Sequence, residues 1–167
     1  MHAFLVWLES TAFSVWVRES PSLLAYPAIL SCHTIGMGLV AGINGAIGLR
    51  ILGVGPGVPI AEMKRFIPIM WFGFWLNAAS GVALLIAYPT KALTNPMFYL
   101  KLGLVALALV LLRSIAARIF HENVLEAPSA ARGVKVLAAA SLASWAGVIT
   151  SGRLLAYTYT HLLSNSR

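Results

Sequence analysis

A few polar side chains interrupt an otherwise apolar sequence, and their types suit the binding of a cofactor or an anion. An imidazole is a common ligand of haem iron and copper, while ammonium and guanidinium groups bind carboxylates and phosphates. An amide and a phenol can add hydrogen bonds at the rim of such a site. The candidate cofactor-binding residues are His33, Lys101, Arg153, Asn77 and Tyr157.

Two methionines extend this set toward metal chemistry. Met37 follows His33 by one helical turn, and Met97 precedes Lys101 by one turn. Thioether sulfur and imidazole nitrogen together suit copper, so His33, Met37 and Met97 are the candidate metal ligands. The structural alternatives are a neutral imidazole bonded to a neighbouring helix, methionines that only pack, and a lysine that extends its ammonium to the headgroups.

Hydrolytic chemistry finds no support in the sequence. We find no nucleophile with a base and an orienting acid at a workable spacing. Whether the protein is an enzyme stays open.

The polar residues lie in or beside four long apolar stretches. Hydrophobic residues make up 59% of the chain and charged residues 10%, whereas soluble domains carry about a quarter charged residues. A bilayer core about 30 Å thick takes about 20 helical residues to cross, and hydrocarbon offers free peptide groups no partner. We therefore predict an all-α, polytopic membrane four-helix bundle over residues 22–167, with spans at about 22–49, 67–88, 98–120 and 134–159.

The first 21 residues are too short an apolar segment to span a bilayer. Glu9 lies in the middle of the segment, and Trp7 and Trp16 suit the headgroup layer. We predict an amphipathic N-terminal helix over residues 1–21 that lies flat in the membrane interface.

The basic residues report topology rather than nucleic-acid binding. The net charge of +7 comes from side chains scattered between apolar runs, whereas nucleic-acid binders cluster them on a soluble face. Cytoplasmic loops collect Lys and Arg, so the distribution predicts a bacterial inner-membrane protein with both termini periplasmic. One side carries Arg50, Lys64, Arg65, Arg113, Arg118, Arg132 and Lys135, and the other carries Arg18, Lys91, Lys101, Arg153 and Arg167.

Small residues recur every three or four positions in the first and fourth spans. Such stripes let helix backbones approach closely, so we expect these two spans to pack together. The alternative is a contact with a second copy, or with another membrane subunit, through the Gly38/Gly42 stripe. The two stripes are Thr34, Gly38, Gly42 and Ala46 in the first span, and Ala140, Ser144, Gly147 and Ser151 in the fourth.

Depth in the membrane groups the candidate site residues. His33 lies about ten residues into its span, or about 15 Å from the outer end, and shares the outer half with Lys101 and Arg153. No acidic residue lies within the spans, so either Glu9 or Glu19 folds back to pair with a cation, or a bound anion supplies the charge. A haem propionate, a lipid phosphate or a quinone carbonyl would each fit.

The positions of the other histidines limit a bis-histidine haem site. Under this topology His33 and His121 differ in depth by most of the membrane thickness, so they cannot ligate one iron. His161 and His2 are nearer in depth to His33 but still offset.

These residues belong to segments in which the chain resembles a family of small bacterial four-helix integral-membrane proteins to which no activity is attached. That family is distantly similar to the membrane part of the copper-resistance protein D family. The resemblance covers nearly the whole chain and implies an inner-membrane four-helix bundle that binds copper or haem. The matching segments are Leu8-Glu9, Arg18-Glu19-Ser20, residues 31–36, 49–53 and 71–74, residues 95–98 with Lys101, Phe120-His121, and Gly152-Arg153 with Tyr157.

The sequence leads to two functional hypotheses. The first is a multi-pass inner-membrane protein that holds haem b or copper in the outer half of its bundle, for electron transfer or copper handling. In it His33 is the ligand, Lys101 and Arg153 bind the anionic groups, Asn77 braces the site and Tyr157 hydrogen-bonds at the rim. The alternative is a structural or accessory subunit of a larger membrane complex.

Overall fold

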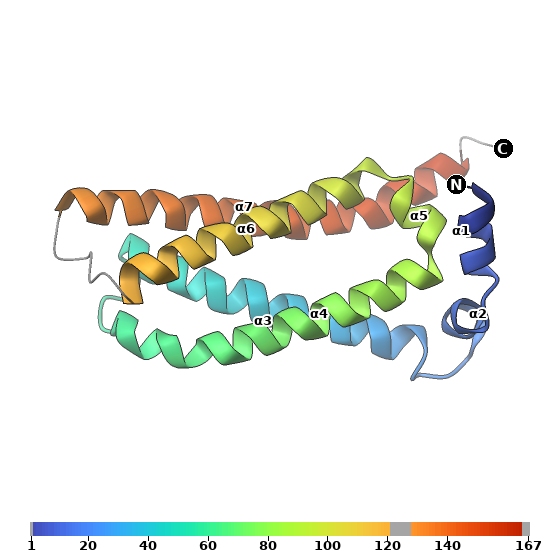
Figure 1. Ribbon diagram of the computed structural model, residues 1–167, viewed down its shortest axis with the longest axis horizontal. Coiled ribbons are helices and arrows are strands. Elements are labelled where there is room, and N and C mark those ends of the chain that lie inside the picture. Colours follow the sequence, from blue (N-terminus) through green and yellow to red (C-terminus); the bar gives the residue numbers. More distant parts are fainter. Residues whose placement is uncertain (1, 121–127, 165–167) are drawn as a thin grey trace.

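Four long helices run antiparallel to one another and form the body of the protein (Figure 1). The computed structural model describes residues 2–120 and 128–164, with side chains described for residues 3–118 and 132–155. Short helices lie between and before the long ones. In chain order the elements are α1 (His2–Glu9), α2 (Ala12–Glu19), α3 (Tyr26–Leu52), the 3-10 helix η1 (Ile60–Phe66), α4 (Ile67–Ala87), α5 (Pro89–Leu93), α6 (Pro96–Phe120) and α7 (Pro128–Ser164).

The all-α membrane bundle predicted from the sequence is confirmed. Within residues 2–120 and 128–164, four helical segments are long and apolar enough to span a bilayer, and their mean hydropathy lies between 1.4 and 2.1. Large apolar side chains cover their outer surface, as Phe72 and Trp75 do with two thirds of their area exposed, which is the pattern expected when lipid is the solvent. The spans are Tyr26–Leu52, Ile60–Ala87, Pro96–Arg118 and Arg132–Leu155.

Local sequence signals set two of the helix ends. Gly53 follows α3 in the left-handed region with φ of 104°, and its N–H bonds to the carbonyl of Arg50, which is the usual glycine stop of a helix. Asn95 precedes α6, and its side-chain oxygen accepts the N–H of Met97 over 2.9 Å. Pro96 fits the first position of α6 because that position needs no N–H donor.

The tightest helix crossing lies between α3 and α4. A Cβ atom on Gly36 would lie 2.6 Å from the backbone nitrogen of Asn77 and 2.7 Å from the carbonyl oxygen of Gly73. A Cβ atom on Gly73 would lie 2.6 Å from that of Leu39. Glycine at both positions therefore lets the two backbones touch, and this crossing fixes the depth of His33 against α4.

The small-residue stripe predicted for the first span does not make the contact between α3 and α7. The two helices do pack together, but through Asn44, which bonds Ser141, and through Gly48, which contacts Leu142. A Cβ atom on Gly38 or Gly42 would meet nothing within 4 Å. At about 100° per residue, Gly42 lies about 160° and Gly38 about 120° around α3 from Asn44. Both glycines are exposed and face away from α7.

Two short helices, rather than one, cross the end of the bundle at the N-terminus (Figure 1). Thr11 interrupts the segment and caps α2 by accepting the N–H of Ser14. Arg18 donates to the carbonyl oxygens of Ala87 at 3.0 Å and Glu9 at 2.7 Å. The Glu9 carboxylate accepts the N–H of Thr90 and so joins the N-terminal segment to α5. Among the described residues, neither Glu9 nor Glu19 forms an ion pair with Lys101 or Arg153, so the first of the two alternatives for the missing counterion is not found.

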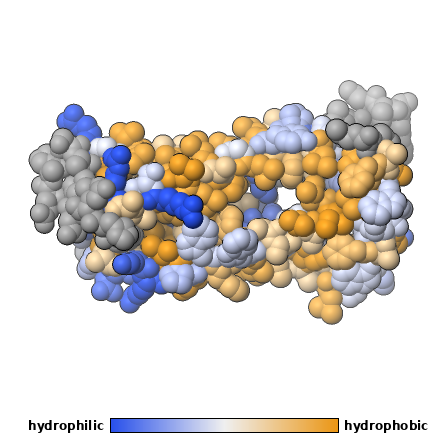
Figure 2. Space-filling model, viewed as in Figure 1, coloured by the Kyte–Doolittle hydropathy of each residue, from blue (hydrophilic) through white to orange (hydrophobic). Residues whose placement is uncertain are grey.

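Neighbouring long helices pack closely along three of the four sides of the bundle. Within the described residues α3 packs along α4, α6 along α7, and α3 along α7, whereas α4 and α6 meet at few points. Figure 2 shows a hollow between the upper and lower helices in the half of the molecule nearer α1 and α2. In Figure 1 the helices on either side of that place are α4 and α6. The bundle is therefore open on one side, facing the lipid.

Candidate functional site

His33 on α3 is the centre of the candidate site, and it contacts two further helices. Its Nδ1 lies 3.0 Å from the carbonyl oxygen of Asn77 and 3.3 Å from Oγ of Ser80, both on α4. Its Nε2 lies 3.3 Å from Nζ of Lys101 on α6. The ring also packs on Gly81, where a Cβ atom would lie 3.1 Å from Cε1.

These contacts determine the tautomer of the imidazole. A backbone carbonyl only accepts, so Nδ1 carries the hydrogen and donates it to Asn77. The Ser80 hydroxyl donates to the carbonyl of Leu76 over 2.6 Å and so meets the ring as an acceptor. Nε2 therefore presents its lone pair to the Lys101 ammonium. A ring fixed in this way by its Nδ1–H is the form in which histidine binds a metal or accepts a proton through Nε2.

Asn77 holds the backbones of α3 and α4 in register at the same point. Its side-chain nitrogen donates to the carbonyl oxygen of His33 over 2.7 Å, while its own carbonyl accepts the hydrogen of the imidazole. The two residues thus exchange hydrogen bonds about one helical turn along α3 from the close crossing at Gly36. The position of the imidazole is set by backbone groups rather than by flexible side chains.

Lys101 brings a positive charge to this site without a matching carboxylate. The lysine is partly buried, its Nζ lies against His33, and its side chain passes 4.0 Å from the Cβ position of Gly152 on α7. Among the described residues, no carboxylate forms an ion pair with it. The hollow in Figure 2 lies in the same half of the molecule. An uncompensated ammonium in this half of the bundle favours a ligand that carries an oxygen acceptor or a negative charge.

Of the other residues proposed from the sequence, those with described side chains make no hydrogen bond to His33, and the rest lie outside the described region. Arg153 is exposed on α7. Met37 packs against the core cluster of Val40 and Met70, and Met97 begins α6 one turn before Lys101. The side chain of Tyr157 lies outside the described residues, as do those of His2, His121 and His161.

A conventional metal cluster is not found in the part of the chain whose side chains are described. No group of three or more His, Cys, Asp or Glu side chains there could hold a metal ion. Cys32 is partly buried next to His33 in the sequence, but neighbouring residues on a helix point about 100° apart.

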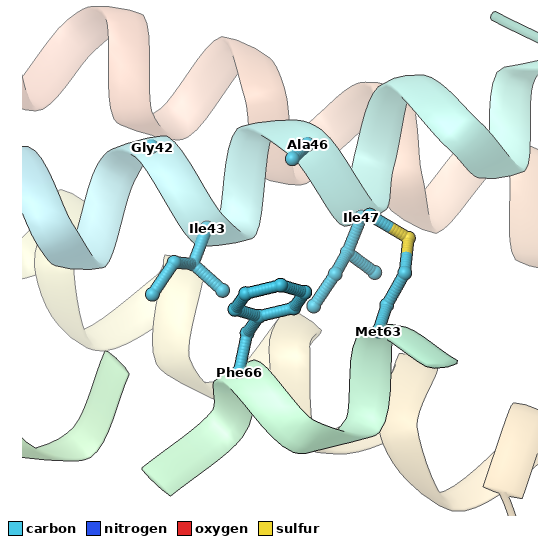
Figure 3. Close-up of a pocket in the computed structure, with 6 residues that line it drawn as sticks. All are labelled: Gly42, Ile43, Ala46, Ile47, Met63 and Phe66. Atoms are coloured by element: carbon cyan, nitrogen blue, oxygen red, sulfur yellow. The ribbon is translucent and has the colours of Figure 1, made fainter. Parts of the chain in front are cut away.

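A second hollow lies between α3 and η1 and is lined by apolar side chains. Figure 3 shows the ring of Phe66 reaching from η1 toward Ile43 and Ile47 of α3, with Met63 beside Ile47. Gly42 and Ala46 complete the lining. Without a polar group this hollow cannot orient a redox group, and it lies three to four helical turns along α3 from His33.

Sequence reasoning missed Ser80 and Gly81 as parts of the site. They follow Asn77 by three and four residues, so all three share one face of α4. The sequence alone shows that these three residues share a face. It does not show that Ser80 and Gly81 contact His33, because serine and glycine are common in membrane helices as plain packing residues.

Comparison of the chain with known protein families, with characterised proteins and with solved structures finds no match. The fold defines a multi-pass membrane protein with a four-helix bundle.

Proposed function

We propose that the protein binds a redox group through the His33 and Lys101 pair in the outer half of its bundle and serves electron transfer. The observation that carries the proposal is the 3.3 Å contact between the lone pair of Nε2 and an ammonium that has no described carboxylate partner. Charged groups at this depth are expensive and usually functional. The membrane we propose is the bacterial inner membrane, in keeping with the resemblance to small bacterial membrane proteins.

Haem b fits the residues present better than copper does. The imidazole has the tautomer required of a haem ligand, and Lys101, once released from Nε2, would bind a propionate. When bound, haem would supply a one-electron couple within the bilayer. A quinone would use the same lysine through a carbonyl oxygen. Copper through His33, Met37 and Met97 is the weaker proposal, because Met37 packs into the core cluster.

Access from the lipid supports a ligand that is itself soluble in the membrane. The bundle is open between α4 and α6, so a flat or chain-like apolar molecule can lie in the opening with its polar end at Lys101. Haem and quinones both combine an apolar body with oxygen acceptors.

The test is the composition and absorption of the purified protein. We expect a Soret band, or a quinone in the organic extract, that is lost in His33→Ala and Lys101→Met. Thr34→Val is the matched control, since Thr34 is exposed and bonds only to Leu30 of its own helix. Stoichiometric copper without haem would favour copper handling. A colourless protein without metal or quinone, prepared from membranes grown with haem precursor, would contradict the proposal.

A second function is favoured by one observation. A Cβ atom on Gly38 or Gly42 would meet nothing within 4 Å, although Gly42 also lines the hollow beside η1. A structural subunit would need such small, uncovered positions for docking another copy or another membrane subunit. Under this function the His33 contacts only lock the helices together. Crosslinking in native membranes tests it: a band of higher mass should disappear in Gly38→Leu/Gly42→Leu and persist in Gly103→Leu on the exposed face of α6.

A further inference from the structure

Asn44, Ser141 and Trp145 form a second polar group in the core, away from His33. Their exposed fractions are 1%, 0% and 4%. The Ser141 hydroxyl donates to Oδ1 of Asn44 over 3.0 Å and joins α3 to α7. Asn44 lies eleven residues after His33, about 16 Å along α3, so this group lies in the other half of the bundle.

Two hydrogen-bond donors of this group meet no acceptor in the described part of the chain. They are Nδ2 of Asn44 and Nε1 of Trp145, and both are fully buried. A buried N–H group without an acceptor is strongly unfavourable, and hydrocarbon around the bundle cannot supply one. Indole nitrogens in protein interiors usually find a partner for this reason.

The helix geometry brings the two donors into one layer of the core. Trp145 follows Ser141 by one turn, and helical side chains lean toward the N-terminal end of their helix. The indole therefore lies over the turn that carries Ser141 and its partner Asn44. Trp145 also packs in one cluster with Val40, which lies one turn before Asn44 on α3.

We propose that Asn44 and Trp145 together bind one acceptor oxygen, either of a buried water molecule or of a carbonyl group on a small ligand. Both protein groups only donate at these atoms, so the bound atom must accept. Both groups are neutral, and Lys101 belongs to the other half of the bundle, so a neutral oxygen suits the site better than an anion. The site is separate from the proposed redox site and does not depend on it.

The hydrogen-bonding state of the Trp145 indole tests this directly. The ultraviolet resonance Raman spectrum of Trp145 is obtained by subtracting that of Trp145→Phe from that of the unchanged protein. We expect the band of a hydrogen-bonded indole, which shifts toward that of a free indole in Asn44→Leu. Trp75→Phe is the matched control, because Trp75 is 67% exposed and its removal should leave the Trp145 band unchanged.

A free-indole band in the unchanged protein would overturn the proposal, and so would a band that Asn44→Leu leaves in place. If either variant fails to fold, a chain with Phe at positions 7, 16, 71 and 75 keeps Trp145 as its only indole and gives the first of these readouts. Removal of extractable lipids separates the two sources of oxygen. A band that persists indicates water, and a band that is lost and then restored by the extract indicates a ligand.

Discussion

At the scale of residues, the two partners of His33 have opposite effects on the stability of the fold. Asn77 contributes to both backbone alignment and imidazole orientation through bonds of 2.7 and 3.0 Å. Lys101 offers Nζ to Nε2 but brings a charge that no described carboxylate neutralises. The hydrogen bonds of Asn77 are expected in any stable helix bundle. The uncompensated charge of Lys101 is not, because it lowers stability.

Asn77→Ala should therefore lower the free energy of unfolding by about 1 kcal/mol, the usual net value of one hydrogen bond. The measurement is unfolding in mixed micelles with increasing denaturing detergent. Ser114→Ala is the control, because its hydroxyl bonds only to Val110 of its own helix and should change stability by less. Equal losses in the two variants would contradict the role given to Asn77.

Lys101→Met should leave the stability of the ligand-free protein unchanged or raise it, with the insertion cost of about 2.5–3.5 kcal/mol as the upper limit. The same variant should lose the proposed redox group. Thermal unfolding and cofactor content are measured on one preparation. A clear loss of stability would show instead that the ammonium supports the fold. Arg153→Met, at an exposed position, should keep the cofactor content of the unchanged protein.

At the scale of elements, close backbone contact decides which helices meet. Gly36 and Gly73 allow α3 and α4 to touch, whereas Gly38, two residues further along, faces outward. The sequence predicts the helices well, because a lipid solvent leaves the backbone no other option. It does not predict which glycines are used, since α3 carries small residues on several faces and the choice depends on the neighbouring helix.

Gly36→Ala should destabilise the protein by about 1–3 kcal/mol, the usual cost of overpacking, because the new methyl would meet backbone atoms at 2.6 and 2.7 Å. Gly38→Ala should be neutral or slightly stabilising, since nothing lies within 4 Å and alanine is the better helix former. Detergent unfolding of the two variants checks the pair. A similar effect in both would show that α3 is rotated from the orientation described.

The N-terminal helices are attached to the bundle by few groups. Arg18 provides one of these bonds, to the carbonyl oxygen of Ala87 on α4, and it also joins α2 to α1 through the carbonyl oxygen of Glu9. Arg18→Met should release α1 and α2, seen as faster amide hydrogen exchange over residues 2–19 without a change in α3 or α7. Arg65→Met is the control, because Arg65 pairs with Glu62 at an exposed position. Unchanged exchange in Arg18→Met would mean that the bonds of Ser14 and Glu9 and the apolar burial of Val17 and Leu5 hold these helices without Arg18.

At the scale of the whole molecule, the two ends differ in polarity. Figure 2 shows the strongly hydrophilic residues gathered at the end where α3 leads into η1, the end we predict to face the cytoplasm. Depth in the membrane predicts the grouping of His33 with Lys101 and Arg153, and Asn77 is expected to brace the site. The contacts observed join His33 to Asn77 and Lys101, which lie 44 and 68 positions away. The depth of a residue can be counted along its span in the sequence. The rotation of each helix about its axis, which decides which side chains meet, cannot.

Orientation is tested with single cysteines in a Cys32→Ala background. Gly57→Cys, in the connection between α3 and η1, should resist a membrane-impermeant thiol reagent in intact spheroplasts and react after lysis. Leu23→Cys, which lies before α3 and is 79% exposed, should react in both. The reverse pattern would place both termini in the cytoplasm.

The sparse contact between α4 and α6 leaves room for the surrounding bilayer to act as a component of the protein. Along that side, we expect acyl chains to fill the place that a close contact of α4 with α6 takes in a closed bundle. The lateral pressure of the membrane would then act on the distance between α4 and α6. Thin or loosely packed bilayers should widen the cleft, and ordered ones should narrow it. Occupancy of the Lys101 site would then follow lipid composition, and reconstitution in lipids of graded chain length would reveal this as a graded affinity.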